Sequence, residues 1–92
     1  MTYIIQYHQD VIEIDIPKLS SANKTRIRKS IEDKLESNPE TFGKPLRRSL
    51  KGYRKLRVGD YRVVFRIEGK NVKILAIKHR SVVYKKNNKI KL

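Results

Sequence analysis

Alternating apolar and polar residues dominate the second half of the chain and predict three β-strands. The alternation covers Gly52–Val58, Tyr61–Glu68 and Asn71–Lys78, all of which are rich in β-branched and aromatic residues. Two pairs that begin with glycine, Gly59-Asp60 and Gly69-Lys70, separate these runs, as in two-residue hairpin turns of type II′. The pattern therefore predicts an antiparallel meander of three strands.

The first half of the chain predicts one more strand, followed by helices. Thr2–Tyr7 alternates like a strand, and the residues from His8 onward predict a short helix that Pro17 limits. A longer helix is expected after Ser20 or Ser21, either of which is a suitable N-cap. Its apolar stripe recurs every four residues, at Ile27, Ile31 and Leu35.

A proline ends the longer helix, and a loop is expected to connect it to the meander. Asn38-Pro39 ends the helix because the residue before a proline is pushed out of helical space. Thr41–Ser49 is expected to be the loop, anchored by Phe42 and Leu46. The expected fold class is α+β, with a small antiparallel sheet of about four strands and N-terminal helices packed on one face. Residues 1–92 are expected to form a single domain that ends in a flexible basic tail at residues 85–92.

The two short turns also fix which side chains share a face of the sheet. They place Val58 opposite Tyr61 and Arg57 opposite Arg62. Because side chains alternate along a strand, one face is expected to be apolar and to lie under the long helix, with Leu56, Val58, Tyr61, Val63, Phe65, Ile67, Val72, Ile74 and Ala76. The other face is expected to carry Tyr53, Lys55, Arg57, Arg62, Arg66, Lys73 and His79, with Val64, Leu75 and Ile77 as a small apolar floor.

The positive charge is concentrated in the second half of the chain. Residues 1–46 contain seven Lys or Arg and seven Asp or Glu, whereas residues 47–92 contain 16 and two, so the net charge of +14 lies entirely in the second half. Like charges placed directly opposite each other, such as Arg57 and Arg62, destabilise a hairpin. An anion held between them would remove that cost. The pattern therefore favours binding of a polyanion over a face that is only solvated.

Several kinds of chemistry lack the residues that they need. The chain has no cysteine, and its two histidines, His8 and His79, have no metal-ligand spacing. No nucleophile with an adjacent base and no glycine-rich phosphate loop is recognisable. RNA carries its own nucleophile in the 2′-hydroxyl group. Arginines would stabilise the charge that develops on its phosphate, and His79, Lys55 and Tyr84 are candidate proton carriers.

Three motifs resemble the RelE/ParE superfamily of bacterial and archaeal toxins. They are GKPL from Gly43, LKGYRKLRVGDYRVVF from Leu50 and HRSVVY from His79. The resemblance covers nearly the whole chain and is greater to the RelE branch. It implies a RelE-like microbial RNase fold and a toxin of a type II toxin–antitoxin pair, which cleaves mRNA in the ribosomal A site without a metal or another cofactor.

The resemblance also implies the residues of the site. Carried over by position, the catalytic residues are Lys55, Arg57, Arg62, Arg80 and Tyr84, to which His79 is added as a candidate base. RNA contacts are expected from Tyr53, Arg54, Arg66 and Lys73. Arg54 is the nearest basic residue to a lysine of the RelE pattern, so it is expected to hold phosphate rather than to carry a proton.

The implied partners are mRNA, the ribosome with its rRNA, and an acidic cognate antitoxin that masks the basic face. A membrane is not expected as a partner, since the basic residues lie on strands and no apolar run approaches the roughly 20 residues of a membrane span. The first residues do not resemble a signal peptide, so a cytoplasmic location is expected. Two alternatives stay open, a ParE-like inhibitor of DNA gyrase without catalysis and a non-catalytic RNA-binding module.

Overall fold

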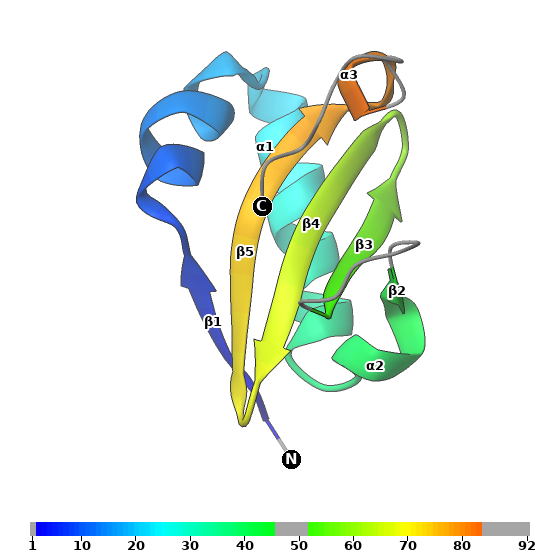
Figure 1. The fold of residues 1–92 in the computed structure, drawn as a ribbon. Coiled ribbons are helices and arrows are strands. Elements are labelled where there is room, and N and C mark those ends of the chain that lie inside the picture. Colours follow the sequence, from blue (N-terminus) through cyan, green and yellow to red (C-terminus); the bar gives the residue numbers. More distant parts are fainter. Residues whose placement is uncertain (1, 46–51, 84–92) are drawn as a thin grey trace.

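The computed structural model describes residues 2–45 and 52–83, which form one sheet and one layer of helices (Figure 1). The elements in chain order are β1 (Ile4–Tyr7), the π-helical turn η1 (Val11–Asp15), the 3-10 turn η2 (Ile16–Lys18), α1 (Ser21–Ser30), the π-helical turn η3 (Ile31–Leu35), α2 (Pro39–Phe42), β2 (Lys44–Pro45), β3 (Tyr53–Val58), β4 (Tyr61–Glu68), β5 (Asn71–His79) and α3 (Arg80–Val83).

The sheet has five strands in the order β1-β5-β4-β3-β2. The predicted meander is confirmed, because β3 pairs with β4 and β4 pairs with β5, both antiparallel. Strand β1 pairs with β5 in parallel, and the two-residue strand β2 adds a fifth member beside β3. The α+β fold class is confirmed, while the expectation of about four antiparallel strands missed β2 and the direction of β1.

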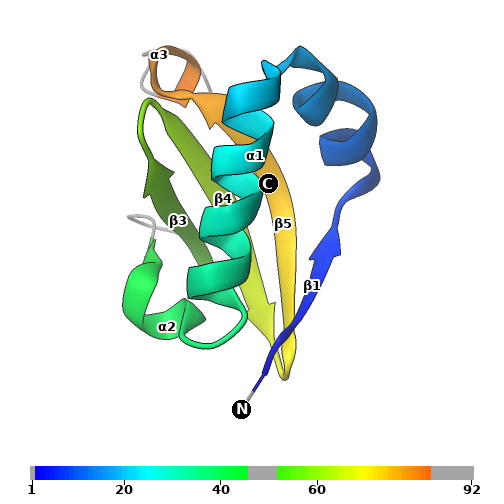
Figure 2. The same cartoon turned by 180° about the vertical axis from the view of Figure 1, so that it is seen from behind.

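The helical layer covers one face of the sheet, and α1 runs across β3, β4 and β5 in the view from behind (Figure 2). Ser20 caps α1 as predicted, since its Oγ accepts a hydrogen bond from the Asn23 N–H at 3.2 Å. The predicted apolar stripe of Ile27, Ile31 and Leu35 is at most 2% exposed and packs into the core. No helix in the described part of the chain crosses the other face, which is called the open face below (Figure 1).

The predicted loop before the meander contains helix α2 and strand β2. Phe42 is 43% exposed, so the expectation that it anchors this segment is wrong, and Leu46 lies outside the described residues. Pro39 and Gly43 are buried here, and the ring of Phe65 packs against Gly43. A methyl group on Gly43 would lie 2.0 Å from Phe65 Cζ, so only glycine fits this contact.

The register of β3 and β4 follows the two-residue turns as predicted. Gly59 has a φ of 58° and Gly69 a φ of 60°, the left-handed conformation that the first position of a primed turn requires. Val58 accordingly faces Tyr61, and Arg57 faces Arg62. The two arginines therefore lie directly opposite each other on neighbouring strands.

The register of β4 and β5 departs from the prediction at one point. Phe65 faces Ile74 but Val64 faces Ala76, so Leu75 is an extra residue that forms a β-bulge. Beyond the bulge every side chain of β5 lies on the face opposite to the predicted one, because the alternation has shifted by one residue. Ile77 lies in the core and not in the predicted apolar floor of the open face. Ala76 lies on the open face and not on the predicted core face. His79 faces Tyr61 on the helical side, and Lys78 takes the place beside Arg62.

Candidate nucleic-acid interface

Four cations from three strands gather at one end of the open face. They are Lys55 and Arg57 from β3, Arg62 from β4 and Lys78 from β5, called the basic cluster below. Arg57, Arg62 and Lys78 face one another across the ladder and form a row. Since neighbouring strands lie about 4.8 Å apart, the row spans roughly 10 Å, which suits the phosphate groups of one nucleic-acid strand.

Arg62 lies at the centre of this row and is held in one orientation. It is 5% exposed, and its Nη1 donates hydrogen bonds to the carbonyl oxygens of Gly59 at 3.1 Å and Tyr61 at 3.0 Å. Arg57 beside it is exposed. A fixed guanidinium next to an exposed one suits a phosphate, which accepts two parallel hydrogen bonds from an arginine.

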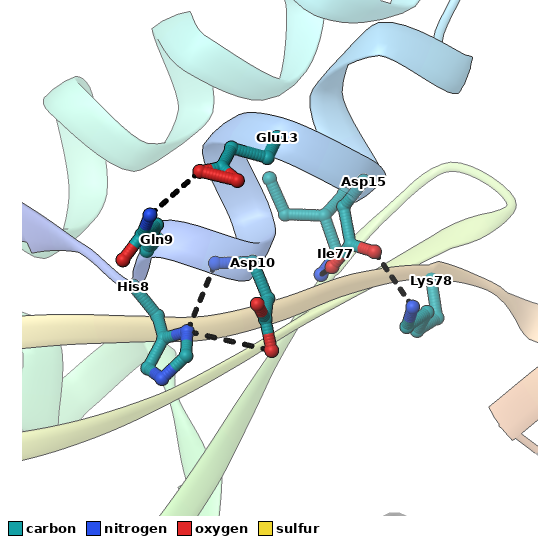
Figure 3. A network of polar contacts seen from close by, with 7 residues as sticks. All are labelled: His8, Gln9, Asp10, Glu13, Asp15, Ile77 and Lys78. Carbon is teal, nitrogen blue, oxygen red and sulfur yellow. Dashed lines mark hydrogen bonds and ion pairs between the residues drawn. The ribbon is translucent and has the colours of Figure 1, made fainter.

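Lys78 is positioned by a residue that the sequence analysis missed. The Asp15 carboxylate is 5% exposed and accepts a hydrogen bond from Lys78 Nζ at 2.6 Å (Figure 3). Its other oxygen accepts the backbone N–H of Ile77 at 3.0 Å. Strand β1 pairs with β5 only as far as Ile74. Beyond the end of β1, the Asp15 carboxylate accepts a backbone N–H of β5. The available signal was the carboxylate of Asp15 in the otherwise largely apolar stretch VIEIDI.

The other end of the open face carries a second group of side chains, near the turn between β4 and β5. The Arg66 guanidinium lies 5.8 Å from the centre of the Tyr53 ring and pairs with Glu68. Lys73 Nζ also pairs with Glu68, at 3.1 Å. Hydrogen bonds from Lys73 and then Arg66 lower the pKa of the Glu68 carboxyl below its ordinary value. This end is therefore less positive than the basic cluster, and three of the predicted RNA-binding residues lie here.

The remaining predicted site residues do not join the basic cluster. Arg54 faces Phe65 on the helical side, and its Nη1 donates to the Gly43 carbonyl oxygen at 3.0 Å. His79 packs edge-on against the Tyr61 ring at 5.4 Å, and its Nδ1 accepts the Ser81 N–H at 3.2 Å. Arg80 follows at the end of β5 with an exposed side chain. Tyr84 lies outside the described residues.

His8 has a local structural role. Its carbonyl oxygen accepts the N–H groups of Val11 and Ile12, and its own N–H donates to Ile74 O, so it joins β1 to η1. Within residues 2–45 and 52–83, no group of three or more potential metal ligands is present. Over the same residues, no helix is both long and apolar enough to cross a membrane.

The architecture defines a small α+β protein in which helices support one face of a sheet and cations cover the other. Its sequence matches the family model described as ParE toxin of type II toxin–antitoxin system, parDE, over residues 9–84. In structure it is similar to a chain of the RelBE2 toxin–antitoxin complex from Mycobacterium tuberculosis, with a TM-score of 0.79 and 30% identity over 88% of this chain and 94% of that one.

Two further relatives also carry the name RelE. The archaeal RelE–RelB complex from Pyrococcus horikoshii OT3 has a TM-score of 0.70 and 31% identity over 87% of this chain and 97% of that one. Toxin RelE of Mycobacterium tuberculosis is 46% identical over 55 residues, which are 58% of this chain and 57% of the relative. The chain thus spans somewhat more than half the length of this curated relative. The protein belongs to the RelE/ParE superfamily of type II toxin–antitoxin toxins, as the three motifs predicted.

Proposed function

We propose that this protein is the toxin of a type II toxin–antitoxin pair and cleaves mRNA in the A site of the ribosome. The row of Arg57, Arg62 and Lys78 supports this most directly, since Arg57 and Arg62 lie directly opposite each other at a spacing that suits the phosphate groups of a nucleic-acid strand. The names of its relatives, which include Toxin RelE, favour the RelE branch. A ribosomal substrate implies action in the cytoplasm.

The proposed reaction uses the nucleophile of the substrate. The RNA 2′-oxygen attacks the adjacent phosphorus while the bond from phosphorus to the 5′-oxygen breaks, which leaves a 2′,3′-cyclic phosphate and a 5′-hydroxyl group. Arg57 and Arg62 stabilise the negative charge that develops on the non-bridging oxygens. No step requires a metal ion or another cofactor.

Two protons must move in this reaction. One leaves the 2′-hydroxyl group, and one reaches the departing 5′-oxygen. Lys55 lies within the basic cluster and is a candidate carrier, while Tyr84 is a candidate by its position after Arg80. His79 lies at the end of β5 on the side of Tyr61, so it reaches the substrate only if the RNA passes around that end.

We further propose an acidic cognate antitoxin as the regulatory partner. Solved relatives are toxin–antitoxin complexes, from Mycobacterium tuberculosis and Pyrococcus horikoshii OT3. An acidic segment laid over the open face would neutralise the basic cluster and exclude RNA from it.

A second candidate function is inhibition of DNA gyrase without catalysis. The observation in its favour is the matching family model, whose description names ParE. In that case the basic cluster would bind a protein or DNA and would leave RNA intact.

Primer extension on a defined mRNA tests the proposed function. Purified protein is added to the mRNA alone and to 70S ribosomes that are stalled on it with an empty A site, both in excess EDTA. A cut at the A-site codon only in the presence of ribosomes is the expected result. No cut in either sample contradicts the nuclease proposal, and a gyrase supercoiling assay then tests the second candidate.

A further inference from the structure

A hollow of about 330 Å³ lies at the edge of the sheet where β2 meets β3. Three of the described residues that line it belong to the basic cluster, namely Lys55, Arg57 and Arg62. The rest includes Lys34 from η3, Phe42 from α2 and Lys44 from β2. Helix α2 and strand β2 lie beside β3 in Figure 1, so the basic cluster continues sideways into this hollow. Lys34, Phe42 and Lys44 were not among the binding residues expected from the sequence.

The hollow is lined by two pairs of like charges that oppose each other directly. Lys44 faces Lys55 across β2 and β3, and Arg57 faces Arg62 across β3 and β4. No carboxylate is among the described side chains that line it. Lysine and arginine side chains form charge-assisted hydrogen bonds with phosphate oxygens. The hollow therefore suits a phosphate group.

Phe42 adds an aromatic ring to this cationic hollow. Its side chain is 43% exposed, although a phenylalanine of a small protein is commonly buried. The short helix α2 holds its backbone, through a hydrogen bond from Phe42 N–H to the Asn38 carbonyl oxygen at 3.1 Å. Lys34 Nζ lies 5.7 Å from the centre of the ring. An exposed ring on a fixed backbone, beside cations, is how proteins hold a single-stranded base next to its phosphate.

We propose that this hollow binds one nucleotide of the RNA strand, with its base stacked on Phe42 and its phosphate between Lys44 and Arg57. The inference rests on the proposed function for the identity of the strand, since it extends the same binding surface beyond the cleaved phosphate. Stacking needs only the flat face of a base, so the hollow selects no particular sequence. It would hold the RNA in register with the basic cluster.

A binding experiment separates the base contact from the phosphate contact. The probes are two labelled single strands of 2′-O-methyl RNA, which lack the nucleophile, one with all bases and one with abasic positions. Fluorescence anisotropy gives the dissociation constant of each strand. Phe42→Leu removes the aromatic ring but keeps an apolar side chain, and Phe42→Tyr is the matched control that keeps the ring.

The expected results differ between the two contacts. Phe42→Leu should weaken binding of the complete strand roughly 5- to 100-fold and leave the abasic strand within about twofold, while Phe42→Tyr stays close to the unmodified protein. Lys44→Gln should weaken both strands equally and reduce the salt dependence of binding by about one phosphate contact. Lys29→Gln on the exposed side of α1 removes the same charge at a residue that does not line the hollow and is the control for net charge.

Three outcomes overturn the inference, and each can be distinguished from a failure of the proposed function. The inference is wrong if Phe42→Leu weakens both strands equally, if it weakens neither, or if the unmodified protein binds neither strand. Primer extension on ribosomes is measured in parallel for every variant. If the mRNA is cleaved but Phe42→Leu causes no base-dependent loss of affinity, only the nucleotide site is contradicted. If the base-dependent loss of affinity is seen without cleavage, only the nuclease proposal is contradicted.

Discussion

At the scale of single residues, Arg62 has the most constrained position in the candidate site. Its guanidinium is nearly buried, and two backbone carbonyl oxygens fix its direction. A donor that is held in place before the substrate arrives needs no reorganisation during the reaction, which is where much of the catalytic benefit of such groups arises. Arg62 is therefore expected to matter more for the rate than for binding.

Replacement of Arg62 tests this expectation. Arg62→Ala should lower the rate of A-site cleavage about 100-fold or more, since the transition state loses a preorganised donor. Arg62→Lys, which keeps the charge but not the planar pair of donors, should recover only part of the rate. The measurement is single-turnover cleavage on stalled ribosomes, with thermal unfolding to show that the variants fold. An Ala variant within tenfold of the unmodified rate would exclude the assigned role.

Asp15 gives a second prediction at this scale. Asp15→Ala leaves the buried Ile77 N–H without its acceptor and releases Lys78, so it should reduce the free energy of unfolding by about 1–3 kcal/mol. Asp15→Asn keeps an oxygen for Ile77 and should cost less. Urea unfolding measures both changes. Equal stability of all three proteins would show that Asp15 is not needed at the edge of β5.

The sequence predicted the positions of some residues of the candidate site and could not predict those of others. Lys55, Arg57 and Arg62 were identifiable because a two-residue turn sets their register within a few residues. Asp15 and Lys78 pair across 63 positions, and no local pattern specifies such a contact. Phe42 was predicted as a buried anchor because of its apolar side chain, but Pro39 and the contact of Gly43 with Phe65 take that place.

At the scale of the elements, the strands and the long helix were predictable because each has a clear apolar period. Strand β2 has two residues, which is too short for any period. The bulge in β5 could not be predicted from the sequence because Ile74, Leu75, Ala76 and Ile77 are all apolar. An extra residue among them disturbs no alternation of apolar and polar residues. The face of every side chain after the bulge could therefore not be derived from the sequence.

The hairpin of β4 and β5 gives a prediction about Glu68. Glu68→Gln should strengthen RNA binding, since Arg66 and Lys73 lose their carboxylate partner and the open face gains one positive charge. Anisotropy with single-stranded RNA at low salt measures the change. The control is Glu13→Gln, which removes an exposed carboxylate of η1 whose side chain accepts a hydrogen bond from Gln9. A weaker affinity for the Glu68 variant would contradict the prediction.

The same residue predicts a dependence of stability on pH. Because the folded state lowers the pKa of Glu68, its stabilising effect is present above the ordinary glutamate pKa and is lost as the pH falls through the folded value. The melting temperature of the unmodified protein should therefore exceed that of Glu68→Gln at neutral pH. The difference should shrink as the pH falls below the ordinary glutamate pKa and vanish once it falls below the folded pKa. A difference that grows on acidification would reverse the assigned sign.

At the scale of the whole molecule, the two halves of the chain have separate tasks. The neutral first half supplies α1, α2 and the two edge strands β1 and β2, while the second half supplies the meander and the entire net charge. The helical layer covers the apolar face, while the open face carries Lys55, Arg57, Arg62, Arg66 and Lys73. Binding of a polyanion should therefore be dominated by displaced counterions.

Salt dependence tests this description. Lys78 is paired with Asp15, which leaves phosphate contacts from Lys55, Arg57 and Arg62, so a plot of log affinity for single-stranded RNA against log salt should have a slope of about −2. Arg57→Gln should reduce the slope by about 0.7, as each contact contributes that amount. A slope near zero would mean that the cations of the open face do not meet phosphates.

The extra residue of β5 has a consequence for related chains of different length. Removal of Leu75 would leave Ile74 and Ala76 as sequence neighbours opposite Phe65 and Val64, and all partners on either side would be kept. A relative that is one residue shorter at this point can therefore present the same cations from its last strand. A gap in an alignment at this position indicates a straightened strand, and the site on both sides of the gap can still be compared residue by residue.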